Sequence, residues 1–184
     1  MTTYLALLRG INVGGHKMVA MADLRDLLTN LGFAGARSLQ QSGNLVFSSE
    51  RRRSAAALER VLEEEAATRL RVQSDFLVRS VEEWKTVVAS NPFREEAKSD
   101  PSHLLVVFLK EAPTARNIAA LRAAIAGREL VRVKGREAYC VYPDGVGRSR
   151  LTHAIIEKHL GTRATGRNWN TVLKLGALAE SNRA

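Results

Sequence analysis

The sequence of 184 residues has little of several residue types, and each shortage excludes a class of protein. One cysteine, Cys140, excludes an intramolecular disulfide and a cysteine-ligated metal cluster, and a lone thiol is typical of a reducing compartment. The apolar runs are too short to span a membrane, and no basic segment precedes the first of them, as a secretory signal requires. We therefore expect a cytoplasmic protein with no membrane partner.

Aromatic residues and local catalytic signatures are scarce as well. Two Trp, three Tyr and five Phe are spread along the chain, without the aromatic core motif of RNA-binding sheet platforms. His153 and His159 are six residues apart, off one helical face, so they predict no metal pair. No nucleophile elbow is present, and His16 is a candidate acid–base group without an assignable partner. The sequence predicts no metal and no cofactor, and it leaves open whether the protein is an enzyme.

Positive charge is what the chain has in excess. Twenty-eight basic residues against nineteen acidic ones give a formal net charge of +9, and most of the excess lies in the second half of the chain. Such a field attracts polyanions and speeds their encounter with the protein. Abundant arginine is also a consequence of GC-rich coding, which spreads it over surfaces without a function. Both interpretations stay open.

Apolar spacing predicts the same order of elements in both halves. Apolar runs at residues 4–8 and 103–109 indicate buried strands, and helical spacing follows each of them. Each half continues with a hairpin, a second helix, a fourth strand and an extra helix. The β-α-β-β-α-β order is typical of a ferredoxin-like unit. We predict an α+β fold of two ferredoxin-like repeats, residues 1–90 and 103–184, joined by a linker over residues 91–102. The first and third strands are expected to be central and parallel, with helices on one face.

The glycine-rich stretch between the first strand and the first helix is the strongest candidate site. Backbone N–H groups near a helix start favour anions, and glycine lets the backbone approach a ligand closely. The stretch is not a P-loop, because His16 stands where lysine is required and Met18 follows Lys17. A turn that needs several positive φ angles is the alternative interpretation. The candidate ligand-binding residues here are Arg9, Gly10, Asn12, Gly14, Gly15 and Lys17.

Other arginines also stand directly before predicted helices. Arg51 begins a run of three arginines before a helix that Ser54 can cap, and Arg148 and Arg150 precede a helix in the second half. Loops after the first and third strands are expected to leave the same edge of the sheet. Arg51 would then lie beside the glycine-rich stretch, and the turn at residues 41–44 would lie at the opposite edge. Solvated basic loops are the alternative.

A late motif combines Arg167, Asn168 and Trp169 at a predicted helix start. Trp169 can stack on a base while Arg167 binds its phosphate. The alternative is that Asn168 caps the helix and Trp169 anchors it in the core.

Several motifs, in this order along the chain, carry a resemblance to a known family. They are residues 7–17 (LLRGINVGGHK), 21–25 (MADLR), 31–33 (LGF), 41–44 (QSGN), 91–93 (NPF) and 167–172 (RNWNTV). Together they resemble the bacterial family catalogued as domain of unknown function 1697, over nearly the whole chain. The resemblance implies two ferredoxin-like halves and no established activity, catalytic residue or cofactor. Gln40 departs from the family pattern, in which an apolar residue is expected.

Three classes of function remain open. The favoured one is a module that binds a phosphate-bearing or other anionic partner, a nucleic acid or a nucleotide-like ligand, because two glycine-containing strand-to-helix loops are basic. The second is a small-molecule enzyme with a cleft between the two halves. The third is a protein-interaction module that recruits partners through exposed sheet edges.

Overall fold

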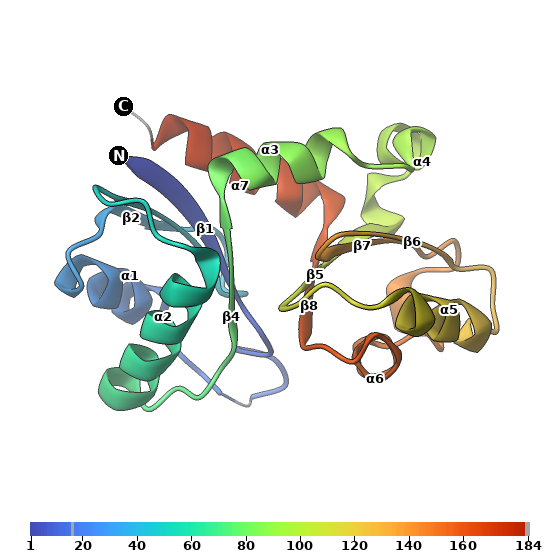
Figure 1. Ribbon diagram of the computed structural model, residues 1–184, viewed down its shortest axis with the longest axis horizontal. Coiled ribbons are helices and arrows are strands. Elements are labelled where there is room, and N and C mark those ends of the chain that lie inside the picture. Colours follow the sequence, from blue (N-terminus) through green and yellow to red (C-terminus); the bar gives the residue numbers. More distant parts are fainter. Residues whose placement is uncertain (16, 183–184) are drawn as a thin grey trace. The chain divides into compact units, whose positions relative to one another are not determined.

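The strands form two four-stranded antiparallel sheets in a computed structural model that describes residues 1–15 and 17–182 (Figure 1). The described residues contain eight strands and seven α-helices. The α+β chain divides into two compact units. One is residues 1–86 with the chain from residue 174 onward, and the other is residues 87–173.

Each unit follows the same order of elements. The first contains β1 (Thr2–Leu8), α1 (Met21–Asn30), β2 (Ala34–Ser38), β3 (Asn44–Ser49), α2 (Ala55–Leu70), β4 (Phe76–Ser80) and the start of α3 (Val81–Ala89). The second contains α4 (Arg94–Ser99), β5 (Leu104–Leu109), α5 (Ala115–Ala124), β6 (Leu130–Lys134), β7 (Glu137–Val141), α6 (His153–Leu160), β8 (Ala164–Asn168) and the start of α7 (Trp169–Ser181). The expected layout of two repeats is therefore present. Residues 91–102, the expected linker, contain α4, and residues from 174 onward belong with the first unit.

The direction of the central strands differs from the expectation. The strand orders are β2-β3-β1-β4 and β6-β7-β5-β8, and β1 is antiparallel to both β3 and β4. The expectation that the first and third strands are parallel was wrong. A helical crossover makes β2 run in the direction of β1, and the β2–β3 hairpin then reverses the chain. The loop after β3 therefore leaves the sheet at the opposite end from the loop after β1.

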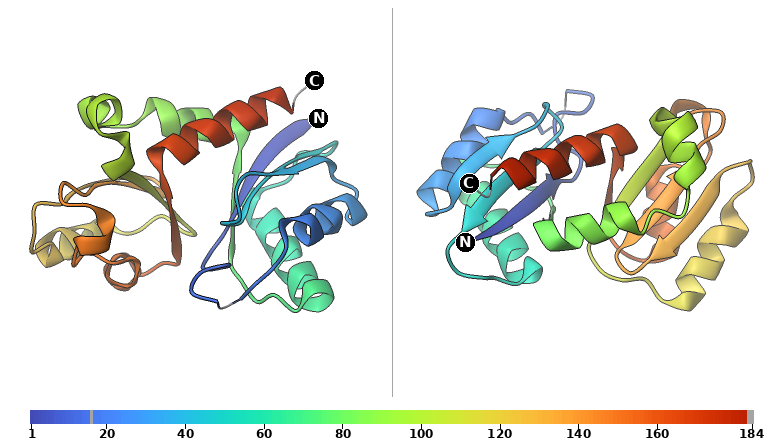
Figure 2. Two further views of the ribbon diagram at one scale, coloured as in Figure 1. Left: turned by 180° about the vertical axis from the view of Figure 1, so that it is seen from behind. Right: turned by 90° about the horizontal axis from the view of Figure 1, so that it is seen from above.

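The core of the first unit lies between the sheet and the helices α1 and α2, which cover one face (Figures 1 and 2). Tyr4, Ala6 and Leu8 alternate along β1 and point to this face, as the two-residue period of a strand requires. Burying each large apolar side chain contributes roughly 1.5–3 kcal/mol. The helical side of the core is made by Leu24, Leu27, Leu28, Leu58 and Leu62.

The edge strand β4 is covered by carboxylates from α2. Glu63 Oε1 accepts from the N–H of Phe76 at 2.9 Å, and Glu59 Oε1 accepts from the N–H of Val78 at 2.8 Å. In the second unit Glu157 Oε1 accepts from the N–H of Ala164 in β8 at 2.8 Å. These bonds satisfy donors that would otherwise pair with another chain.

The second unit has its own core between its sheet and the helices α5 and α6. Alternate residues of β5 meet Leu121 of α5 and Ile156 of α6, and Cys140 of β7 is fully buried among them. The helix α6 begins at a threonine cap, since Thr152 Oγ1 accepts from the N–H of Ile155 at 3.3 Å.

Candidate functional site

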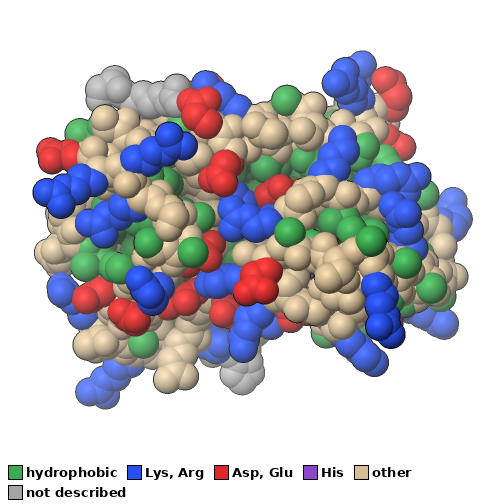
Figure 3. Space-filling model, viewed as in Figure 1, with side chains coloured by type: hydrophobic (Ala, Val, Ile, Leu, Met, Phe, Trp, Pro, Cys, Tyr) green, Lys and Arg blue, Asp and Glu red, His purple; other side chains and the backbone are tan. Residues whose placement is uncertain are grey.

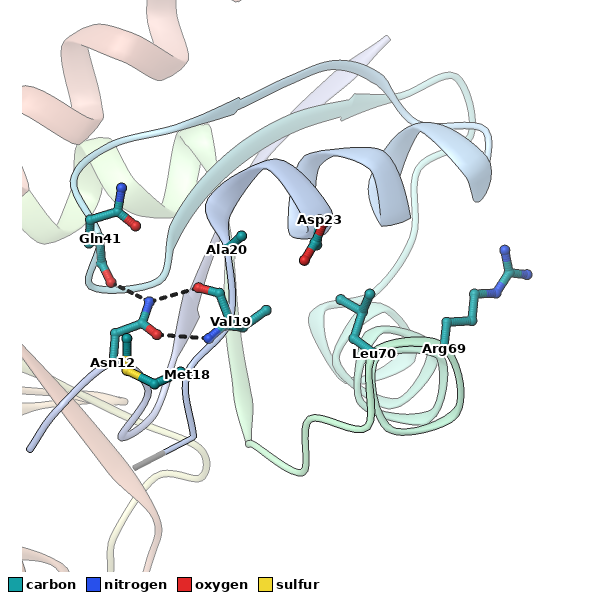
Figure 4. A pocket seen from close by; sticks show the side chains of 8 residues that line it. All are labelled: Asn12, Met18, Val19, Ala20, Asp23, Gln41, Arg69 and Leu70. Atoms are coloured by element: carbon teal, nitrogen blue, oxygen red, sulfur yellow. Dashed lines mark hydrogen bonds between the residues drawn. The ribbon is translucent and has the colours of Figure 1, made fainter. Parts of the chain in front are cut away.

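A cavity of about 740 Å³ lies in the first unit beside the loop between β1 and α1 (Figure 4). We call it the loop cavity. It is lined by Asn12, Met18, Val19, Ala20, Asp23, Gln41, Arg69 and Leu70. These residues come from the β1–α1 loop, the first turn of α1, the β2–β3 turn and the last turn of α2. The antiparallel topology brings the four segments together, because the last residues of β1, β2 and α2 all lie at the same end of the sheet.

Asn12 fixes the shape of the loop. Its Oδ1 accepts from the N–H of Val19 at 2.8 Å, and its Nδ2 donates to the carbonyls of Val19 at 3.0 Å and Gln41 at 2.7 Å (Figure 4). Its backbone N–H donates to the carbonyl of Lys17 at 3.3 Å. Because both amide hydrogens are used within the protein, Asn12 positions the cavity wall and does not offer its amide donors to a ligand.

The loop itself is long and conformationally demanding. Residues 9–20 connect β1 to α1, and φ is positive at Gly10, Asn12, Gly14, Gly15 and Lys17. Positive φ is uncommon outside glycine, so Asn12 and Lys17 hold costly conformations. The stretch is therefore a turn with several positive φ angles, as the alternative interpretation of the sequence predicts. The second unit makes the corresponding β5-to-α5 connection with residues 110–114 alone, so the topology does not require the long loop.

The β2–β3 turn packs directly against this loop. The N–H of Leu8 donates to the carbonyl of Gly43 at 2.9 Å. Gly43 has φ +73°, and a Cβ there would lie 2.8 Å from both Leu8 Cβ and Ile11 Cδ1. Only glycine allows so close an approach. The expectation that residues 41–44 lie at the opposite edge was wrong, and the direction of β3 is the reason.

The start of α1 lacks, in the described part of the chain, the side-chain cap that is present at the starts of α2, α5 and α6. Ala20 stands at its N-cap with φ −73° and ψ 136°, and no described side chain caps it. Ser54, Thr114 and Thr152 each accept a backbone N–H at the starts of α2, α5 and α6. The first turn of α1, which reaches the cavity through Ala20 and Asp23, thus keeps N–H donors that no described residue accepts.

Two side chains of opposite charge complete the lining. Asp23 of α1 is exposed and lines the cavity (Figure 4). Arg69 of α2 forms an ion pair through Nε with Glu65 Oε2 at 2.5 Å, and its guanidinium is directed outward, away from the β1–α1 loop (Figure 4). Met18, Val19 and Leu70 add apolar surface, and Met18 is 67% exposed.

Arg9 is not among the residues that line the loop cavity. Its guanidinium lies 3.6 Å from Asp75 Oδ2, and its carbonyl accepts from Ser74 Oγ at 2.7 Å. These contacts tie the end of β1 to the start of β4. Lys17, Gly10, Gly14 and Gly15 are exposed on the loop. His16 lies outside the described residues.

Arg51 lies at the other end of the first sheet, after β3. Ser49 Oγ donates to its carbonyl at 2.8 Å, and the Tyr4 hydroxyl bonds to both backbone groups of Arg53. The expectation that Arg51 lies beside the glycine-rich loop was wrong, since β1 and β3 are antiparallel. In the second unit Arg148 and Arg150 are exposed and follow the third strand, β7. They correspond to the arginine run after β3, and not to the glycine-rich loop.

In the late motif, residues 167–169, Asn168 caps the helix and Trp169 is buried, as the alternative interpretation of this motif predicts. Arg167 is 8% exposed within β8 and donates to Thr165 Oγ1 at 2.7 Å and the Gly166 carbonyl at 2.8 Å. Burial lowers the pKa of its guanidinium to about 10. Asn168 Oδ1 accepts from the N–H of Asn170 at 3.0 Å at the start of α7, and Trp169 is buried. Arg167 and Trp169 thus lack the exposure that a phosphate or base would need.

Figure 3 shows basic side chains spread over the face that it draws, with acidic ones among them mainly on its left and in its centre and few on its right. Within the described residues no helix is long and apolar enough to cross a membrane, and no cluster of His, Cys, Asp and Glu can hold a metal ion. Sequence reasoning missed Asp23 and Arg69, and it placed Gln41 at the opposite edge of the sheet. The signal that identifies them is strand direction, which places the ends of β2 and α2 beside the end of β1.

Comparisons with known proteins identify a family and similar solved structures. The family described as "Protein of unknown function (DUF1697)" has a model that matches residues 1–139. A conserved bacterial protein from Streptococcus pneumoniae, SP0830, has a solved structure similar to this one, with a TM-score of 0.76. It is 27% identical, and the match covers 97% of this chain and 98% of that chain. No curated protein matches the chain.

Proposed function

The chain belongs to the DUF1697 family of proteins of unknown function, and we propose that it binds a small anionic ligand, phosphate-bearing or carboxylate, in the loop cavity. We further propose that each unit is a ferredoxin-like repeat, which the order of elements and the antiparallel order β2-β3-β1-β4 support. A cytoplasmic location is part of the proposal, supported by the single, buried cysteine.

The length of the β1–α1 loop is the observation that carries the proposal. Such connections usually take two to six residues. The second unit makes its equivalent in residues 110–114, whereas the first unit uses residues 9–20 and holds Asn12 at φ 53°. Strained conformations persist where the surroundings hold them, and they cluster at binding and active sites. Two side-chain bonds of Asn12 to Val19 close the loop on itself, and its bond to Gln41 holds the loop against the β2–β3 turn, so that one wall of the cavity is preformed.

The proposed charge of the ligand follows from the donors around the cavity. Arg69 is among the lining residues and offsets the negative charge of Asp23, and the first turn of α1 offers backbone N–H groups. Lys17, which is exposed and next in sequence to the lining residue Met18, adds a positive charge to the same loop. The volume of about 740 Å³ lies within the range of small-molecule pockets. A carboxylate or phosphate group therefore finds both charge and hydrogen-bond donors there.

Calorimetric titration of the full chain with inorganic phosphate, a nucleoside monophosphate, small carboxylates and an oligonucleotide tests the proposal. The decisive variant is Ala20→Asp, whose carboxylate would cap α1 and compete with an anion. We expect it to raise stability by about 1 kcal/mol and to abolish binding, so that lost binding cannot be ascribed to unfolding.

Ala123→Asp on the exposed face of α5 is the matched control for added charge, and it should bind as the wild type does. Binding that survives Ala20→Asp would contradict the proposal. An oligonucleotide that binds with steep salt dependence and regardless of Ala20→Asp would place phosphate recognition elsewhere and would also overturn it.

A further inference from the structure

We infer that the outer edge of β6 binds an extended, acidic segment of another protein, which joins the second sheet as an additional antiparallel strand. The inference is independent of the loop cavity, which lies in the first unit. It starts from a comparison of the four strands that stand at the edges of the two sheets, β2, β4, β6 and β8.

Three of these edge strands carry a feature that hinders pairing with a further strand. Carboxylates of α2 accept N–H groups of β4, and Glu157 of α6 accepts the N–H of Ala164 in β8. The strand β2 is irregular, because its register shifts between Ala34 and Arg37 and Gly35 has φ +60°. Bulges and covered donors are means by which edge strands avoid pairing with other chains.

The edge of β6 is regular. Residues 130–134 pair with β7 without a shift of register, through a two-residue turn in which Gly135 has φ +58°. The residues that flank such a turn form a hydrogen-bonded pair, and bonded and non-bonded pairs alternate from there. The N–H and C=O groups of Val131 and Val133 therefore point away from β7. Among the described residues nothing accepts either N–H, and Arg132 Nη1 alone donates to these carbonyls, to that of Val131 at 3.0 Å.

The side chains on one face of β6 define the chemistry of the partner. Alternating with the two valines are three exposed residues, Leu130, Arg132 and Lys134. Residues directly opposite each other on antiparallel strands interact, and opposite charges favour the pair. An added antiparallel segment should therefore carry an acidic residue opposite Lys134, another opposite Arg132 and an apolar one opposite Leu130. From its N-terminus the segment has acidic, acidic and apolar residues at alternate positions.

The same charges disfavour a second copy of this chain as the occupant. A two-fold antiparallel pair of β6 strands centred on Arg132 places this residue opposite its own copy, and one centred on Val133 places it opposite Lys134. A pair centred on Val131 places Lys134 opposite Arg128. Like charges directly opposite each other are destabilising. An acidic segment meets no such repulsion, and the net charge of +9 attracts it over longer distances.

A nine-residue peptide with blocked ends tests the inference on the full chain. It carries glutamate as its third and fifth residues, leucine as its seventh, and threonine or valine elsewhere. At saturating peptide, hydrogen exchange of the Val131 and Val133 amides should slow. The amides of Arg132 and Lys134, which already bond to β7, should change little. Binding without protection of the two valine amides would overturn the inference.

N-methylation of the peptide separates main-chain pairing from attraction between charges. Methyl groups on its fourth and sixth nitrogens remove the donors that face Val133 and Val131, and should weaken binding roughly tenfold or more. Methyl groups on the third and fifth nitrogens, which face away from β6, are the matched control and should weaken binding much less. Equal losses would show that charge alone holds the peptide and would overturn the inference.

Charge reversal tests the choice of partner. The double variant Arg132→Glu/Lys134→Glu should lose the glutamate peptide and bind one with lysine at both positions, which the wild type should not bind. Such an exchange of specificity cannot result from unfolding. Arg116→Glu/Arg122→Glu, exposed on α5 of the same unit, changes the net charge equally and should keep the wild-type preference. A double variant that still prefers glutamate, or a wild-type chain that dimerises through β6, would overturn the inference.

Discussion

At the scale of single residues, polar side chains in this protein mostly bind its own backbone. Asn12 bonds the loop to Val19 and Gln41, Asn44 Nδ2 bonds the carbonyl of Leu39 at 3.0 Å, and Arg167 bonds a neighbouring carbonyl. Each fixes a segment that the strand and helix ladders leave open. Their loss should therefore affect stability.

Asn12→Asp tests the positioning role of this amide. The substitution keeps an acceptor for the N–H of Val19 but turns a second oxygen toward the carbonyls of Val19 and Gln41. We expect the free energy of unfolding, measured by urea denaturation, to fall by roughly 1–3 kcal/mol. Asn30→Asp, at the exposed end of α1, should change it little. Equal effects of the two variants would contradict the role assigned to Asn12.

Cys140 gives a pH-dependent prediction. Burial raises the pKa of its thiol to about 12, whereas an unfolded cysteine titrates near about 8.5. Between these values the unfolded state loses a proton that the folded state keeps, so stability falls as the pH rises through this window. Cys140→Ala should weaken that fall. The native thiol should also resist alkylation until the protein unfolds, and rapid alkylation under native conditions would contradict its burial.

At the scale of elements, helix α2 stabilises the edge of the first sheet. Its carboxylates accept the N–H groups of Phe76 and Val78, and Glu157 of α6 does the same for β8. A carboxylate of the second helix thus accepts from an N–H of the edge strand in both units. Because this helix lies alongside the edge strand, its acidic residues can satisfy donors that no further strand covers.

Glu59→Ala tests this contact. Glu59 is 4% exposed, so its loss leaves the buried N–H of Val78 without that acceptor, at a cost of roughly 1–3 kcal/mol. Hydrogen exchange at the Val78 amide should accelerate more than the global loss of stability explains. Glu64→Ala, exposed on the same helix, is the control. If Val78 exchanges at the same rate in both variants, the contact does not protect the edge.

The order of elements could be predicted from the sequence, because apolar spacing and caps such as Ser54 are local signals. The relative direction of β1 and β3 was not read correctly, although it follows from the crossover and the hairpin. That single error moved Arg51 beside the loop and Gln41 away from it. The partners of Asn12 and the burial of Arg167 could not be predicted, since both depend on contacts between segments far apart in the sequence.

At the scale of the whole molecule, the chain from residue 174 onward returns to the first unit. Gly176 of α7 lies against the Trp84 ring, with 3.4 Å from a Cβ placed there to ring atoms, and Asn182 Nδ2 donates to Ser48 Oγ at 3.2 Å. Trp84 is 1% exposed. The end of the chain therefore helps to bury the face of the sheet opposite α1 and α2.

Ending the chain at residue 173 should destabilise the first unit. We expect the fluorescence of Trp84 to shift to the red in a Trp169→Phe background, as its ring becomes exposed to water. Glu180→Ala removes only the exposed ion pair with Lys85, whose atoms are 3.5 Å apart, and should change stability by less than about 1 kcal/mol. An unshifted Trp84 spectrum in the shortened chain would contradict the packing described here.

Ligand binding in the loop cavity, and not at the arginine-rich loops, is measured by amide chemical-shift mapping of the full chain during titration with phosphate and with a small carboxylate. We predict that shifts for whichever of these binds concentrate at Met18, Val19, Ala20, Asp23 and Gln41, and vanish in Ala20→Asp. Shifts confined to residues 51–54 or 146–152 would contradict it.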